Sequence, residues 1–240
     1  MRRALLGAGL LAIGVGAAAP APAAVDAGAA APRVSQLVVF RDGSSLAKTV
    51  STRAATVKIG GRRCSAGDGT PLAALVRSRP GTLRLHDFGS CSRRAADGAG
   101  LFVAGIGGDL NRGQNGWVYK VGNRAATAGA ADPGGPFGRG RLRSGQRVTW
   151  FYCRMKSGGC QRTLAVKLRA SAGTLTATVK GYDDQGHAAA VPQATVTAGK
   201  FTAVTGGNGT ATLDLPAGRY SVVAAKAGLV RSFAERVEVP

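Results

Sequence analysis

The sequence predicts an α+β domain followed by an all-β sandwich. Three observations lead to this prediction. Short segments in which apolar and polar residues alternate recur along the whole chain, as in half-buried strands. One segment with helical spacing, residues 70–77, lies among the strands of the first part. Beyond residue 170 no helical period is found, and turns rich in Gly, Asn and Asp separate short strands, as in a small sandwich.

The first domain is expected to contain one helix among its strands. Thr70 is suited to cap the N-terminus of this helix, and Pro71 fits its first position. Pro80-Gly81 ends it. The segment 64–69 is expected to be a loop. The predicted strands of the first domain cover residues 34–40, 46–59 (one or two strands), 83–88, 101–106, 116–123, 145–153 and 163–168.

Two of these strands carry both tryptophans and two of the four tyrosines. Trp117 and Tyr119 share one face of their strand, and Trp150 and Tyr152 share one face of theirs. Two interpretations remain open. The four rings line a stacking surface for a sugar, a corrinoid or another flat ligand, or they fill the core beneath the helix. We favour the core, because a single alternating face on two adjacent strands suits core packing.

A second candidate site is the Gly-rich loop 134–141 with the arginine that follows it. Its guanidinium groups suit phosphate or carboxylate, and its glycines allow backbone amides to approach an anion. A plain flexible connection is the interpretation that we favour. The arginines concerned are Arg139, Arg141 and Arg143.

The N-terminus has the pattern of an export signal. Arg2 and Arg3 precede an apolar stretch that ends in small residues suited to cleavage. We therefore predict a signal peptide over residues 1–24 and a secreted or cell-envelope-associated protein. An Ala/Gly/Pro linker over residues 25–32 follows. No later stretch is long and apolar enough to cross a bilayer.

The four cysteines are expected to form disulfides, because their number is even and the chain is predicted to be exported. Three pairings are possible. We favour Cys64–Cys91 with Cys153–Cys160, which joins neighbours in the sequence. A zinc site is not predicted, because there is no Cys-x-x-Cys and neither histidine lies near a cysteine at ligand spacing.

The formal charge of +20 is unevenly distributed. Residues 33–169 contain 24 Lys and Arg against 6 Asp and Glu, whereas residues 170–240 contain 6 against 5. A cationic exported domain favours anionic cell-envelope polymers or membrane surfaces as partners, and nucleic acid is not expected. The competing interpretation is compositional: 24 of the 32 basic residues are Arg in a chain rich in Ala and Gly, and they are scattered.

Catalysis has little support in the sequence. There are two histidines, His86 beside Asp87 and His187 in a loop, and no Gly-x-Ser-x-Gly nucleophile motif. The acidic residues are dispersed. We therefore predict no catalytic residue, no cofactor and no enzymatic activity, with a secreted hydrolase as the least supported alternative.

Five segments of the first domain, 70–75, 101–108, 116–123, 129–132 and 142–152, resemble the transcobalamin C-terminal-like domain of unknown function found in exported bacterial proteins. The match covers residues 33–169. Gly122 and Asn123 stand in swapped order, and Gln146 replaces the usual Asp. The resemblance implies a β-grasp-like fold. In transcobalamin-type proteins this domain helps to close over a corrinoid, beside a large helical-repeat domain that this chain lacks.

After a linker at 170–172, residues 173–240 resemble the carboxypeptidase regulatory-like, transthyretin-like sandwich. The matching segments are 194–197, 205–213, 215–222 and 224–232. Such domains are commonly accessory or spacer modules. The sequence therefore favours a non-enzymatic binding or surface-associated protein, in which the cationic first domain recognises an extracellular partner. The alternative is a small-ligand binder that uses the aromatic strands.

Overall fold

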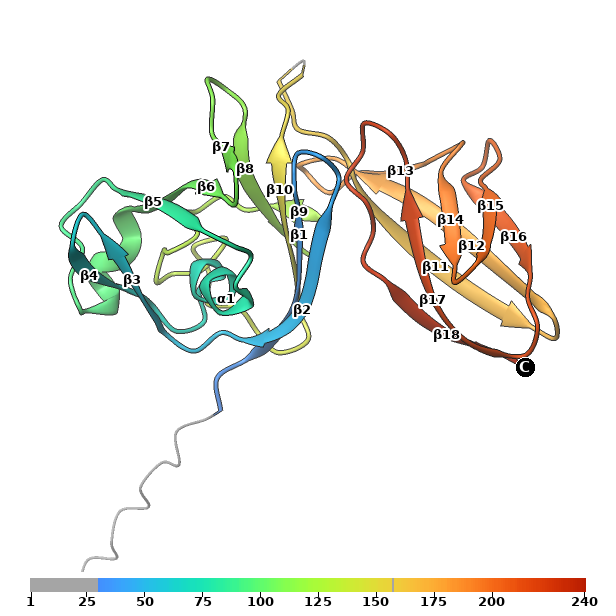
Figure 1. Cartoon of the computed structure of the whole chain (residues 1–240), viewed down its shortest axis with the longest axis horizontal. Helices are drawn as coiled ribbons and strands as arrows, with labels where there is room; N and C mark the ends of the chain where they lie inside the picture. The colour runs from blue at the N-terminus through green and yellow to red at the C-terminus, as the bar shows by residue number, and fades with distance from the viewer. Residues whose placement is uncertain (1–29, 157) are drawn as a thin grey trace, which may run out of the picture. The chain divides into compact units, whose positions relative to one another are not determined.

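The computed structural model describes residues 30–156 and 158–240. The export signal expected over residues 1–24, and most of the linker 25–32, lie outside the described residues. Residues Ala31–Pro240 form one compact, strand-rich unit with several sheets (Figure 1). We call residues 31–162 the first lobe and residues 163–240 the second lobe, because each has a hydrophobic core of its own.

The first lobe contains three sheets and two short helices. Its main sheet has the order β2-β1-β10-β8-β9, in which β1 and β10 are parallel. The pair β3–β4 and the trio β5-β6-β7 form smaller sheets. The elements are β1 (Arg33–Val39), β2 (Ser45–Ser51), β3 (Ala55–Ile59), β4 (Arg62–Ala66), α1 (Pro71–Ser78), β5 (Leu83–Asp87), the 3-10 helix η1 (Ala95–Gly100), β6 (Leu101–Ile106), β7 (Asp109–Leu110), β8 (Gly116–Val121), β9 (Arg124–Ala125) and β10 (Arg147–Cys153).

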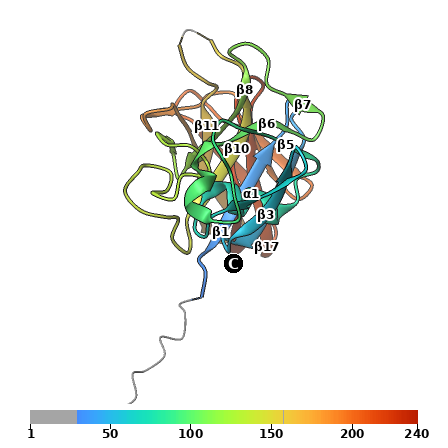
Figure 2. The same cartoon turned by 90° about the vertical axis from the view of Figure 1, so that its left-hand side faces the viewer.

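Helix α1 forms where the sequence predicts it. The side-chain oxygen of Thr70 accepts the N–H of Ala73 at 3.2 Å, and Pro71 occupies the first turn. The helix packs against β1 and β2 (Figures 1 and 2). It buries Leu72 and Leu75 completely. This burial removes apolar side chains from water, the main source of stability for so short a helix.

The two aromatic strands, β8 and β10, are antiparallel neighbours, with Tyr119 opposite Trp150 and Trp117 opposite Tyr152. The predicted alternation of their faces is confirmed. One face of β10 contributes Trp150 and Tyr152 to the core under α1, and the other contributes Phe151 to a separate apolar cluster. β10 lies between two other strands and is covered on both faces. Its sequence is therefore almost continuously apolar.

Two details differ from the sequence-based expectation. The segment 64–69 is not all loop, because residues 64–66 continue β4 in a hairpin with β3. The strand expected over 163–168 as the last of the first domain is β11 (Thr163–Ser171), which pairs along its whole length with β12 (Thr174–Tyr182). Leu164 and Val166 belong to the core of the second lobe. The segment 170–172, expected to be a linker, therefore leads into a hairpin turn at Gly173.

The second lobe is built from two four-stranded sheets, as expected of a β-sandwich. One sheet contains β11-β12-β13 with β16 paired to β12, and the other has the order β15-β14-β17-β18. Buried residues alternate with partly or fully exposed ones along β12 and β16, so one face of their shared sheet contributes to the core of the lobe. The remaining strands are β13 (Ala188–Ala190), β14 (Thr195–Ala198), β15 (Phe201–Val204), β16 (Thr210–Asp214), β17 (Gly218–Ala225) and β18 (Glu235–Val239).

A buried lysine joins the two lobes. The Lys120 ammonium on β8 is fully buried and donates to the carbonyl oxygens of Tyr182 and Asp183, at 3.0 and 2.8 Å. Its Nζ also lies 3.2 Å from a carboxylate oxygen of Asp184. Burial lowers the pKa of Lys120, while the carboxylate of Asp184 opposes this effect. The first lobe thus supplies a charge that the turn after β12 is shaped to bind.

Candidate functional site

The four aromatic residues singled out in the sequence lie in the core of the first lobe. Trp117, Tyr119, Trp150 and Tyr152 are all at most 8% exposed. The rings of Tyr119 and Trp150 are stacked with their centroids 4.9 Å apart, and Trp117 meets Tyr152 edge-to-face at 6.0 Å. These two geometries are the favourable ones for aromatic pairs. Core packing is therefore the first role of these residues.

Two hydrogen-bond donors of the aromatic core have backbone carbonyl partners within the first lobe. The Tyr119 hydroxyl donates to the carbonyl of Ala128 at 2.8 Å, and Trp117 Nε1 donates to the carbonyl of Asp109 at 2.8 Å. Burial raises the pKa of the Tyr119 hydroxyl, so it is a neutral donor at physiological pH. Trp150 Nε1 is buried and has no hydrogen-bond partner among the described residues.

A cavity of about 300 Å³ follows the outer edge of β8, where the short strand β9 pairs with only two residues; we call it the β8-edge cavity. It brings together three of the predicted site residues, Trp117, Tyr119 and Trp150, but not Tyr152. None of the three candidate arginines lines it. Its other walls are Leu101, Phe102, Val103, Val118, Lys120, Ala125, Ala126, Ala128, Gly129, Ala130, Phe151, Cys160 and Asp184.

The candidate anion loop forms a compact turn structure whose Pro136 carbonyl accepts the N–H of Ala128, a residue of the cavity wall, at 3.2 Å. Its backbone closes on itself through the N–H of Gly140, which donates to the carbonyl of Gly134 at 2.8 Å. Arg139, Arg141 and Arg143 are all exposed. Arg141 lies 3.9 Å from the carboxylate of Asp68, a weak contact between two solvated side chains. The aromatic and arginine groups of the prediction are thus separate features.

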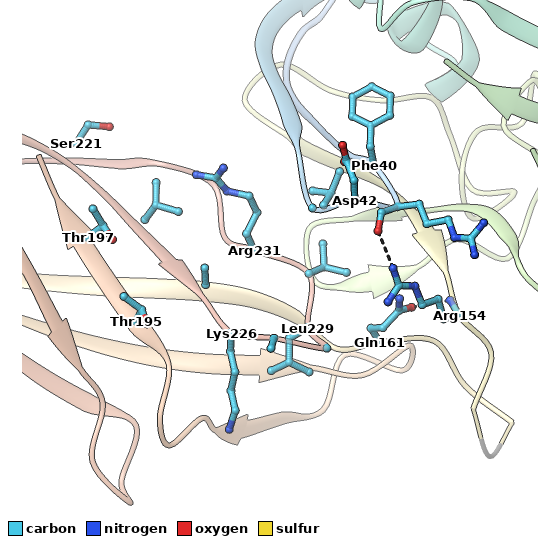
Figure 3. Close-up of a pocket in the computed structure, with 18 of the residues that line it drawn as sticks. Phe40, Asp42, Arg154, Gln161, Thr195, Thr197, Ser221, Lys226, Leu229 and Arg231 are labelled. Atoms are coloured by element: carbon cyan, nitrogen blue, oxygen red, sulfur yellow. Dashed lines mark hydrogen bonds between the residues drawn. The ribbon is translucent and has the colours of Figure 1, made fainter. Parts of the chain in front are cut away.

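A larger groove of about 800 Å³ is lined by residues of both lobes (Figure 3). Its basic side chains are Arg41, Arg154, Lys226 and Arg231, and we call it the cationic groove. Its one acidic residue is Asp42, whose pKa is lowered by hydrogen bonds from Ser44. None of the four basic residues forms a salt bridge within the described ranges 30–156 and 158–240.

Three of the four basic side chains of the groove donate hydrogen bonds to neutral oxygens and not to carboxylates. Arg154 donates to the carbonyl of Arg41 at 2.6 Å (Figure 3). Arg231 donates to the hydroxyl of Ser45 at 2.9 Å. Lys226 donates to the carbonyl of Pro192 at 2.6 Å. Their charges therefore remain uncompensated. The sequence did not reveal this groove, because its walls come from segments almost two hundred residues apart.

Uncompensated positive charge extends over the surface of the whole first lobe. This lobe contains 22 Lys and Arg against 6 Asp and Glu, and five of the 22 take part in ion pairs. The 17 that remain are all exposed. The second lobe contains 8 against 5. These 17 residues are Arg33, Arg41, Lys48, Arg53, Lys58, Arg63, Arg77, Arg79, Arg84, Arg93, Arg94, Arg112, Arg124, Arg139, Arg143, Arg154 and Lys156.

The histidines lie in separate surroundings. The ring of His86 packs against Phe88 at 4.3 Å between centroids, and His187 lies 3.3 Å from the carboxylate of Asp183 in an exposed turn. Among the described residues, no group of three or more His, Cys, Asp and Glu is arranged to hold a metal ion. The structure therefore places neither histidine in a cluster of metal ligands.

The predicted disulfides are confirmed. Cys64 is joined to Cys91, and Cys153 to Cys160. Two disulfides fit an extracellular or otherwise oxidising environment. Within the part of the chain that the structure describes, no helix is long and apolar enough to span a bilayer.

No protein-family model, curated protein or solved structure matches this chain.

Proposed function

We propose that this protein is an exported, non-enzymatic binding protein whose first lobe recognises an anionic partner outside the cell, with the second lobe as a spacer. The observation that carries the proposal is the set of 17 exposed basic side chains of the first lobe that form no salt bridge with any residue of the described ranges. A polymer or a membrane surface of the cell envelope has the matching charge. Export is supported by the two disulfides and by the N-terminal pattern.

The physical basis is long-range attraction. A single exposed ion pair contributes little, but many like charges on one lobe produce a potential that concentrates anions at its surface. The formal charge of the first lobe is +16, against +3 for the second. Because exposed charges are screened within about 10 Å at 0.1 M salt, such binding weakens steeply as salt is added.

We further propose that the first lobe is a transcobalamin C-terminal-like, β-grasp-like domain, and the second a carboxypeptidase regulatory-like sandwich. The Thr70-capped helix over one face of a mixed sheet, with β8 and β10 as its aromatic strands, supports the first assignment. The two four-stranded sheets of the second lobe support the other. β11, at residues 163–171, is assigned to the sandwich.

Binding to inorganic polyphosphate tests the function. Lys58 and Arg63 face each other across β3 and β4, and Lys167 and Arg169 are an exposed pair on β11. We expect polyphosphate to bind at low salt and to be released in moderate salt. The double variant Lys58→Gln/Arg63→Gln should bind severalfold more weakly, and its matched control Lys167→Gln/Arg169→Gln should bind like the wild type. Absence of binding at low salt, or equal loss in both variants, contradicts the proposal.

A second candidate function is small-ligand binding in the β8-edge cavity, for which its aromatic and alanine-rich lining is the supporting observation. Its volume is at the lower end of the range for ligand sites. The candidates are a flat sugar, an aromatic molecule or one part of a corrinoid. A thermal-shift screen should find a ligand whose stabilising effect resists salt. Ala126→Met, which fills the cavity, should abolish that effect; a ligand unaffected by this variant binds elsewhere.

A further inference from the structure

The first lobe presents a contiguous aromatic patch to solvent. Phe88 is 74% exposed and Phe102 is 45% exposed, and their ring centroids are 6.0 Å apart. His86 packs against Phe88 at 4.3 Å and lies directly opposite Phe102 in the pairing of β5 with β6. We call these three residues the aromatic patch. Single exposed apolar residues are ordinary, whereas a cluster of rings on a soluble surface indicates a binding surface.

The backbone that carries Phe88 is held on both sides. The Asp87 carboxylate accepts the N–H groups of Gly89 and Cys91, at 3.0 and 3.1 Å. The N–H of Phe88 itself donates to the carbonyl of Gly100 at 3.0 Å. Cys91 is in addition tied to β4 by its disulfide. The backbone of Phe88 is therefore held in place, and its ring lies against His86 and Phe102 on the surface.

Close packing of η1 also restrains the turn that carries Phe88. A Cβ atom at Gly100 would lie 2.8 Å from the amide nitrogen of Gly89, and one at Gly98 would lie 2.5 Å from the carbonyl oxygen of Ser65. Both distances are shorter than real Cβ contacts. The glycines thus allow η1 to press against β4 and against the turn that carries Phe88, which leaves that turn little room to move.

Basic residues surround the patch. Arg84 alternates with His86 on the exposed side of β5, and Arg93 and Arg94 are exposed in the segment that follows the turn. The Asp87 side chain is 3% exposed and forms a salt bridge with Arg62 at 2.9 Å. Asp97 is exposed and accepts a hydrogen bond from the Ser92 hydroxyl, so one negative charge stands against the three arginines. The patch is therefore apolar at its centre, and the residues around it carry a net positive charge.

We propose that the aromatic patch docks on the surface of an anionic lipid bilayer, with the Phe88 and Phe102 rings in the interfacial region and the surrounding arginines on the headgroups. This inference rests on the proposed function and names its partner as a membrane surface. Phenylalanine carries no hydrogen-bonding group. The transfer of its exposed ring from water into an apolar phase is therefore the favourable contribution that it can make to binding. A hydrated anionic polymer would engage the arginines but offer no such phase, and a second copy of this chain would bring like charges together.

Vesicle binding by the mature protein tests the inference. The vesicles contain phosphatidylcholine alone or mixed with phosphatidylglycerol, and inorganic polyphosphate is the soluble probe. We expect binding to the anionic vesicles only. Phe88→Ser/Phe102→Ser should weaken it by roughly tenfold or more, because two rings no longer leave water, while polyphosphate binding stays unchanged. Val204→Ser is the matched control, since Val204 is 62% exposed on β15 of the second lobe.

The outcomes separate this inference from the function on which it rests. A wild-type protein that binds polyphosphate but not vesicles, or a double serine variant that binds vesicles normally, overturns the membrane inference alone. A wild-type protein that binds neither probe overturns both. If the double variant does not fold, Phe88→Trp serves instead. Its fluorescence should shift to the blue on anionic vesicles, over the constant background of the buried Trp117 and Trp150, and an unshifted spectrum contradicts the inference.

Discussion

The two lobes achieve stability by different means. The second lobe is a regular sandwich whose core consists largely of small aliphatic side chains from alternating positions, and it contains no cysteine. The first lobe divides its strands among three sheets, carries long connections and contains both disulfides. It also carries the exposed basic residues and the aromatic patch. The lobe with the candidate binding surfaces is thus the one that depends on covalent links and a large aromatic core.

This difference has a physical reason. Exposed charges and phenylalanines contribute little to folding, so the segments that display them need anchors of another kind. The Cys64–Cys91 bridge and the Asp87 carboxylate provide such anchors for the turn at Phe88. In the second lobe, regular strand pairing and alternation of buried side chains provide the stability without such anchors. Four predictions test this contrast, beginning with the largest expected effect.

Trp150→Ala should destabilise the first lobe most. Trp150 is 1% exposed and stacked on Tyr119, and truncation of a buried tryptophan costs about 3–5 kcal/mol. Leu175→Ala, at a fully buried site of the second lobe, is the comparison. Urea unfolding should show the larger shift for Trp150→Ala. An equal or smaller shift would mean that the aromatic pair does not dominate the stability of its lobe.

Removal of the Cys64–Cys91 bridge should cost about 3.5 kcal/mol, and removal of Cys153–Cys160 about 2.5 kcal/mol, because the first closes the longer loop in the unfolded chain. The measurement is thermal unfolding of the two Cys→Ala double variants. Only the first should also raise hydrogen exchange at the amides of Phe88 and Gly89. If both variants raise it equally, the bridge does not anchor this turn specifically.

Lys120→Met should uncouple the lobes at a cost of about 1–3 kcal/mol, since it leaves the carbonyls of Tyr182 and Asp183 without their buried donor. Lys180→Met is the matched control, because Lys180 is exposed on β12. We expect unfolding of Lys120→Met to become broader or biphasic in calorimetry, while the control remains like the wild type. A sharp, unshifted transition for Lys120→Met would show that this contact does not couple the lobes.

Replacement of Asp87 should have the smallest effect, a change in how the free energy of unfolding depends on pH. The amides of Cys91 and Gly89 hold the pKa of Asp87 below its ordinary value of 3.8. In acid the Asp87 carboxylate therefore binds a proton more readily in the unfolded chain than in the folded protein. The resulting stabilisation is complete above about pH 4 and is lost as the pH falls through the lower folded-state pKa. Asp87→Asn should flatten the stability curve there in urea titrations from pH 2 to 6, and a curve like that of the wild type would contradict this role of Asp87.

Much of the first lobe is predictable from particular residues. Thr70 and Pro71 identify the start of α1, and the alternation around Trp117 and Trp150 assigns the faces of β8 and β10. The four cysteines pair as neighbours in the sequence. The candidate site is only partly predictable. Three of the four aromatic residues meet at the β8-edge cavity, but the arginines of the loop lie elsewhere.

The features that the sequence did not reveal are those that depend on distant segments. The alternation of β11 fits a strand in either domain, and only its pairing with β12 assigns it to the second lobe. Lys120 has the spacing of an ordinary strand residue, and only the turn after β12 makes it a buried link. The cationic groove and the aromatic patch likewise arise from side chains that the fold brings together.

The sequence by itself therefore determined the local structure of this protein: its strands, its capped helix and its excess of positive charge. Caps, alternation and composition act over a few residues, so they can be read directly. The tertiary structure alone decided which strands share a sheet, which aromatic rings are buried, and that Phe88 and Phe102 remain exposed. Pairing and burial depend on contacts between remote segments, which no local pattern encodes.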